Sequence, residues 1–178
     1  MRRVCVFLSS SDGQPADAAA IAALGTEIAT RSLTLVYGGA HRGLMGVLAD
    51  AALAAGGHVI GVIPQALVDL EVAHRGLTEL HVVSTMHQRK AMMFELADAF
   101  IVAPGGFGTL EEAFEQLTGL QLQYHAKPMV FLEIDGFWTP LGAFLDHAVS
   151  RRMLRAEVRR LFRTAASAPT ALDALAAW

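Results

Sequence analysis

The chain has 178 residues, of which 53% are hydrophobic and 17% are charged, and its formal net charge is −3. This balance gives no electrostatic basis for binding nucleic acid, and the single cysteine, Cys5, excludes an intrachain disulfide and a cysteine-based zinc site. The length predicts one domain over 1–178. The shortage of charge predicts either a sheet that is covered on both faces or a surface that a second copy covers.

The predicted elements alternate between short apolar segments and longer helical stretches. In chain order they are a strand at 3–8, a helix at 15–31, a strand at 33–37, a helix at 44–56, strands at 58–63 and 80–83, a helix at 86–97, a strand at 99–103, a helix at 110–123, a strand at 128–133, helices at 138–151 and 155–163, and a short helix after Pro169. Most of the strands are continuous apolar runs, which is typical of parallel sheets. The alternation predicts an α/β, doubly wound sheet.

No apolar stretch reaches the about 18 residues that a membrane span needs. The N-terminal segment has no long apolar region followed by a small-residue cleavage site, as a signal peptide would. We therefore expect a cytoplasmic protein with neither a membrane nor a nucleic acid as its partner.

Two glycine-rich loops follow predicted strands and lead into predicted helices. The first glycine loop spans 38–46 and includes Gly39 and Gly43, and the second glycine loop spans 104–109 and includes Gly105. Ligands of open α/β sheets bind at such strand ends, and a helix start favours phosphate or another anion. Neither loop matches the dinucleotide fingerprint or the P-loop. Glycines can also serve only to make tight turns, but two such loops in one small domain favour a binding site.

Charged residues near these loops suggest chemistry, although each also has a structural explanation. Arg89 and Lys90 open a predicted helix, where cations oppose the helix dipole. A solvated face explains Lys90, whereas the planar fork of Arg89 suits phosphate or carboxylate. Thr109 and Glu112 fit a capping box, which requires no catalysis. Glu112 would also lie beside a sugar whose phosphate is bound by the second glycine loop.

Other reactive side chains show no recognisable catalytic pattern. The histidines lack metal-ligand spacing, so we expect no metal. The run from Ser9 through Ser10 to Ser11 follows the first strand and resembles a polar ligand loop, but a serine nucleophile would need an identifiable base.

The motif PGGxGTxxE at 104–112 and the segment Met86-His87-Gln88-Arg89-Lys90-Ala91 together resemble the LONELY GUY family, the cytokinin riboside 5′-monophosphate phosphoribohydrolases. The resemblance covers nearly the whole chain. It implies a Rossmann-like fold, a homodimer or larger assembly, and no cofactor. It also implies hydrolysis of the N-glycosidic bond of adenine-type nucleoside 5′-monophosphates, prenylated or plain AMP, to free base and ribose 5-phosphate. The family has often carried the label lysine decarboxylase, for which no pyridoxal-phosphate lysine context is evident.

The resemblance also assigns site residues. Arg89 and Glu112 fall on the family's catalytic pair. The expected substrate-binding residues combine the family's positions with residues of the loops: Ser10, Gly39, Gly43, Glu71, Lys90, Gly105, Gly106, Phe107, Gly108, Thr109, Leu110, Glu111 and Thr118. Ser9, Ala40, Ser84, Gly119 and Leu120 depart from the family's pattern, which puts the base specificity in question.

We expect Glu112 to stabilise an oxocarbenium-like transition state and to position or deprotonate the attacking water. Arg89 would hold Glu112 ionised. The alternative is a non-catalytic carrier of a phosphorylated cofactor such as molybdenum cofactor. A structural dimer with a vestigial site is a third interpretation.

Overall fold

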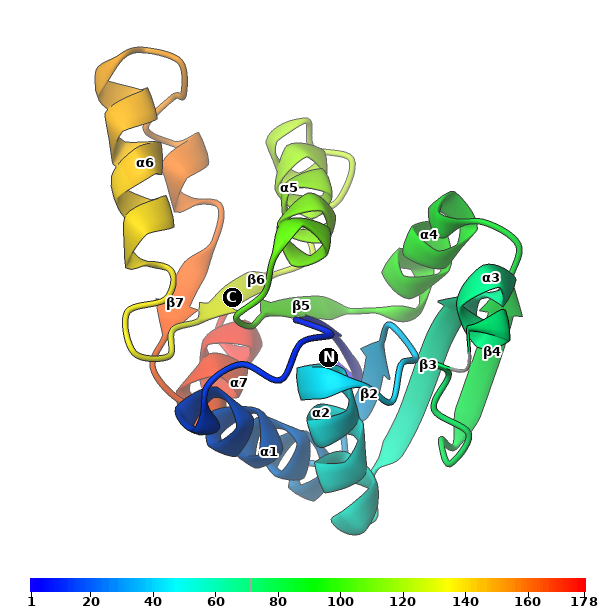
Figure 1. Ribbon diagram of the computed structural model, residues 1–178. Coiled ribbons are helices and arrows are strands. Elements are labelled where there is room, and N and C mark those ends of the chain that lie inside the picture. Colours follow the sequence, from blue (N-terminus) through cyan, green and yellow to red (C-terminus); the bar gives the residue numbers. More distant parts are fainter. Residues whose placement is uncertain (71) are drawn as a thin grey trace.

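Seven strands form one sheet in the computed structural model, which describes residues 1–70 and 72–178 (Figure 1). The strands are β1 (Arg3–Phe7), β2 (Thr34–Tyr37), β3 (His58–Pro64), β4 (Glu79–Val83), β5 (Ala99–Val102), β6 (Met129–Leu132) and β7 (Arg163–Ala165). Their order is β4-β3-β2-β1-β5-β6-β7, and each pair of neighbours is parallel.

Helices cover both faces of the sheet (Figure 1). On one face lie α1 (Pro15–Thr30), α2 (Gly43–Ala54) and α7 (Ala168–Ala176), and on the other lie α4 (Met86–Leu96), α5 (Phe107–Gln121) and α6 (Thr139–Ser150). A short helix, α3 (Gln65–Asp69), follows β3 directly. Within 1–70 and 72–178, no helix has the length and apolar character that crossing a bilayer would require.

The core consists of two apolar layers that the strands separate. Along β1, Val4 and Val6 pack with α1, α2 and α7, whereas Cys5 and Phe7 pack with α4 and α5. All four side chains are buried, because successive residues of a strand point to opposite faces. This arrangement confirms the predicted α/β, doubly wound sheet and explains why its strands are continuous apolar runs.

The predicted helix at 155–163 is wrong. That stretch holds only one 3-10 turn, Val158–Arg160, followed by β7, which the sequence did not predict. The chain must return from α6 to pair β7 with β6, where Phe131 lies opposite Thr164. Leu161 and Phe162, between the 3-10 turn and β7, pack against the core. The segment before β7 is therefore too short for a helix of more than one turn. The helix α3 was also not predicted.

The strand order places a crevice beside β1. After β1, the strands β2, β3 and β4 are added in turn on one side of β1, and β5 then pairs with β1 on the other side. Ligands of open α/β sheets bind at such a reversal, outside the carboxyl ends of the strands. The loops after β1 and β5 meet here, and the backbone N–H of Ser9 donates to the carbonyl oxygen of Pro104 at 3.1 Å.

Candidate active site

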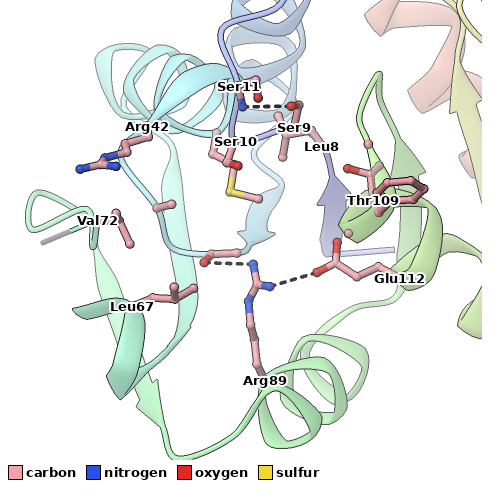
Figure 2. Close-up of a pocket in the computed structure, with 16 residues that line it drawn as sticks. Leu8, Ser9, Ser10, Ser11, Arg42, Leu67, Val72, Arg89, Thr109 and Glu112 are labelled. Carbon is pink, nitrogen blue, oxygen red and sulfur yellow. Dashed lines mark hydrogen bonds and ion pairs between the residues drawn. The ribbon is translucent and has the colours of Figure 1, made fainter. Parts of the chain in front are cut away.

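A cavity of about 470 Å³ opens at this crevice. Its lining includes the predicted site residues Ser10, Arg89, Gly106, Phe107, Gly108, Thr109 and Glu112. Figure 2 shows Arg89 entering from α4 and Glu112 from α5, with the loop at 9–11 across from Arg89. Residues that lie far apart in the sequence are thus gathered at one edge of the sheet.

Arg89 is buried, with its guanidinium held by three groups. Thr85 is the N-cap of α4, and its hydroxyl accepts from the backbone N–H of Gln88. One turn further on, Arg89 Nε donates to the carbonyl oxygen of Val62 at 3.1 Å, and Nη2 donates to that of Gly38 at 3.2 Å. Both carbonyls lie at carboxyl ends of strands. The cation that opposes the dipole of its own helix is therefore stabilised by the sheet.

Gly38 makes room for this guanidinium, because a Cβ at position 38 would overlap Arg89 Nη2. We expect Gly38→Ala to reduce turnover by about 10²-fold, since an ångström of misplacement at a reacting centre has that effect. The fold should survive, because the overlapped atom is the end of a flexible side chain. Steady-state kinetics and thermal melting measure the two effects.

Gly142→Ala is the matched control for this substitution. Its Cβ would lie 3.4 Å from Nη2 of Arg159, away from the cavity, in ordinary van der Waals contact. Equal turnover in the two variants would mean that Gly38 does not position Arg89.

Glu112 forms an ion pair with Arg89 inside the cavity. The distance from Arg89 Nη1 to Glu112 Oε1 is 3.2 Å, and each side chain is 7% exposed. Burial raises the pKa of Glu112 to about 7, although Arg89 acts in the opposite direction. Arg89 thus favours the ionised form of Glu112, as expected, but desolvation has the larger effect and keeps the pKa above its usual value. A carboxyl group that titrates near neutrality is suited to accepting a proton.

The helix α5 begins earlier than predicted, at Phe107, with Gly106 as its N-cap. Thr109 and Glu112 therefore lie inside the helix, and the predicted capping box is wrong. Gly106 and Gly108 have open space where a Cβ would stand, so packing within the protein does not account for these two glycines. The amide groups of the first turn have no acceptor within the helix, and an anion could approach them closely here.

The loops at 9–11 and 38–46 are in direct contact and are joined by a backbone hydrogen bond. Ser11 N–H donates to Ser9 Oγ at 2.9 Å, and Leu44 N–H donates to the carbonyl oxygen of Ser11 at 3.0 Å. A side chain at Gly43 would overlap the backbone of Ser10. Gly43 therefore allows the two loops to dock, without lining the cavity itself.

The other predicted binding residues that the structure describes do not line the cavity. Lys90 pairs with Glu111 and, at 3.2 Å, with Glu115. Thr118 is exposed, and its hydroxyl donates to the carbonyl oxygen of Phe114 at 2.7 Å. The remaining described ones are Gly39, Gly105 and Leu110, which are buried or half-buried and are not among the lining residues. Glu71 lies outside the described residues.

Sequence reasoning assigned no role in the site to the apolar side chains of Leu67 and Val72, which also line the cavity. Leu67 belongs to the unpredicted helix α3. Val72 is tied to the first glycine loop by a hydrogen bond from His41 N–H to its carbonyl oxygen at 2.9 Å. No sequence pattern marks these contacts, because they depend on how a loop folds back over the sheet edge. Among residues 1–70 and 72–178, no group of three or more His, Cys, Asp or Glu could hold a metal ion.

The fold and the cavity together define an α/β protein of the Rossmann type with a buried arginine–glutamate pair beside the glycine-rich start of a helix. Residues 45–175 match the family model described as "Possible lysine decarboxylase". The chain is 46% identical over 175 residues to cytokinin riboside 5′-monophosphate phosphoribohydrolase LOG of Oryza sativa subsp. japonica, covering 97% of this chain and 70% of the relative. The chain belongs to the family of cytokinin riboside 5′-monophosphate phosphoribohydrolases, as its motifs predicted.

A bacterial relative and a solved structure extend the comparison. The phosphoribohydrolase of Rhodococcoides fascians is 51% identical over 149 residues, which is 83% of this chain and 75% of the relative. The molybdenum cofactor binding protein of Rippkaea orientalis superposes with a TM-score of 0.74 over 99% of this chain and 96% of the other. At 20% identity this second likeness shows the fold alone.

Proposed function

We propose that this protein hydrolyses the N-glycosidic bond of a cytokinin riboside 5′-monophosphate or of AMP, releasing the free base and ribose 5-phosphate. The observation that carries the proposal is the buried Arg89–Glu112 pair, which lies in the same cavity as the glycine-rich start of α5. A carrier of an anion would gain nothing from a carboxylate at this point. Family membership supports the same activity.

The proposed substrate lies across the cavity. Its 5′-phosphate binds the first-turn amides of α5, with Thr109 beside it. The ribose then lies over Arg89 and Glu112, and the base extends toward Leu67 and Val72 (Figure 2). Phosphate binding, remote from the broken bond, supplies the energy that positions the reacting carbon.

The proposed chemistry breaks the bond between C1′ and the base nitrogen. Positive charge develops on the sugar as the electron pair leaves with the base, and the Glu112 carboxylate stabilises that charge. Water adds to C1′ and gives a proton to Glu112, the departing base takes up one proton from solvent, and Glu112 then releases its proton to solvent. Arg89 holds the carboxylate in place through its three contacts.

Chromatography of reaction mixtures tests the proposal. Incubation with AMP, and separately with its N6-isopentenyl derivative, should release adenine or the prenylated base together with ribose 5-phosphate. Nucleotide binding without base release from any of these compounds would contradict the proposal and favour a carrier.

The activity should depend on pH through Glu112. Because its pKa is raised to about 7 and its ionised form is the active one, we expect kcat/KM to fall about tenfold per pH unit below this value. Phosphate takes up its second proton near pH ~6, so measurements above that pH isolate Glu112. A kcat/KM that stays constant between about pH 6 and 7 would show that ionised Glu112 is not required.

We also propose that a second copy covers the outer face of α5. Phe114, Leu122 and Tyr124 are exposed there, Tyr124 to 80%, around a shallow groove that Thr118 also lines. Apolar surface of this kind marks an interaction site, and light scattering would give a dimer mass.

We propose a cytoplasmic location, where nucleoside 5′-monophosphates occur.

A further inference from the structure

Arg42 is a second arginine of the cavity, and the proposed reaction does not use it. It lies in the first glycine loop directly before α2, and its side chain is exposed. Within residues 1–70 and 72–178, no carboxylate forms an ion pair with it. Arg89 has three protein partners, whereas no hydrogen bond or ion pair with another described residue engages the guanidinium of Arg42.

Because of its position, Arg42 can contact only the part of a bound nucleotide that lies farthest from the phosphate. Figure 2 shows Arg42 on the same side of the cavity as Val72 and Leu67, across from Thr109 and Glu112, with its guanidinium directed to the outer edge. It therefore lies opposite the proposed phosphate and ribose sites.

Two backbone hydrogen bonds hold together the loops at this end of the cavity. His41 N–H donates to the carbonyl oxygen of Val72, and His74 N–H donates to that of Gly39, both at 2.9 Å. These two hydrogen bonds tie the loop that carries Arg42 to the loop that carries Val72. The wall that results combines apolar surface from Leu67 and Val72 with the guanidinium of Arg42 at its edge.

We propose that Arg42 determines specificity for the N6 substituent of the base and favours a prenyl chain that ends in a hydroxyl group over the purely apolar chain. This inference rests on the proposed function. The apolar wall accommodates the body of the chain, and the guanidinium donates a hydrogen bond to its terminal oxygen. An all-apolar chain of the same length would remove water from Arg42 and return no hydrogen bond.

The test compares two substrates that differ by one hydroxyl group: N6-isopentenyl-AMP and the same nucleotide with a hydroxylated prenyl end. We expect the wild-type protein to favour the hydroxylated substrate by about tenfold in kcat/KM, because a hydrogen bond to a charged group has that effect. Arg42→Leu should abolish the preference, and Arg42→Gln, which retains a donor, should keep part of it. Arg75→Leu removes a nearby exposed arginine that does not line the cavity and should keep the wild-type ratio.

Binding measurements separate the two proposals. In a Glu112→Gln background, titration calorimetry compares the dissociation constants of both substrates with and without Arg42→Leu. A ratio that does not change on replacing Arg42, or base release from AMP but from neither prenylated substrate, would overturn the role of Arg42 and leave the proposed function standing. Absence of base release from every nucleotide by the wild-type protein would overturn the proposed function instead.

Discussion

Glu112→Gln is expected to lower the rate of base release by a factor of about 10³ or more, because general-base and electrostatic contributions are each worth at least about 10². The amide can neither accept the proton of the attacking water nor carry the negative charge that stabilises the sugar cation. The amide is close in size to the carboxyl group and can occupy the same place beside Arg89 Nη1, which lies 3.2 Å from Glu112 Oε1 in the wild-type protein. Quantifying released adenine by chromatography measures the rate, and calorimetry should show AMP binding within a few-fold of wild type.

The protein's stability provides a second measurement for this variant. Folding raises the pKa of Glu112 from 4.5 to about 7, so the folded protein holds this proton more tightly than the unfolded chain. The stabilisation is present below about pH 4.5 and is lost as the pH rises through about 7. Glu112→Gln should remove that pH dependence from thermal melting curves. Glu95→Gln, at an exposed position of α4 outside the cavity, is the control. Adenine release within tenfold of wild type would refute the role of Glu112.

The parts of the fold that could be predicted are those that a short local pattern specifies. The apolar runs of β2 and β5 predict buried parallel strands, and the glycines after them predict where a ligand would approach. The start of α5 was misplaced because Thr109 resembles an N-cap, whereas Gly106 begins the helix without a side-chain cap. A local motif thus identified a loop that lines the cavity and assigned the wrong capping role to one of its residues.

The site's electrostatics could not be predicted, because they depend on burial. Arg89 and Glu112 were expected to pair, and a cation next to a carboxylate normally lowers its pKa. Only the structure shows that both side chains are enclosed, so that desolvation dominates and the pKa of Glu112 is raised instead. In the same way, Gly38 belongs to a predicted loop, but its contact with Arg89 depends on α4 crossing the ends of β2 and β3.

Replacing Arg89 should lower the stability of the protein and shift the pH below which kcat/KM falls. Arg89→Met removes one partner of a buried pair, which typically costs about 3–5 kcal/mol, and leaves the carbonyl oxygens of Val62 and Gly38 without their donor. Because Arg89 lowers the pKa of Glu112, its loss should move the fall in kcat/KM to higher pH. We expect activity at neutral pH to drop by about 10² or more. Arg89→Lys keeps the charge but lacks the planar fork that reaches three partners, so it should restore only part of the activity.

A double substitution separates catalysis from folding. Arg89→Met with Glu112→Leu replaces the buried pair by apolar groups, which is often neutral or stabilising, so the double variant should melt above Arg89→Met alone and show no base release. The energies of the two single variants should not add, because the side chains are in direct contact at 3.2 Å. If the energies add, or if Arg89→Met keeps the wild-type pH profile, the pair is not coupled. The pKa of Glu112 would then be independent of Arg89. The coupled pair, which distinguishes this cavity from a simple anion-binding site, would be absent.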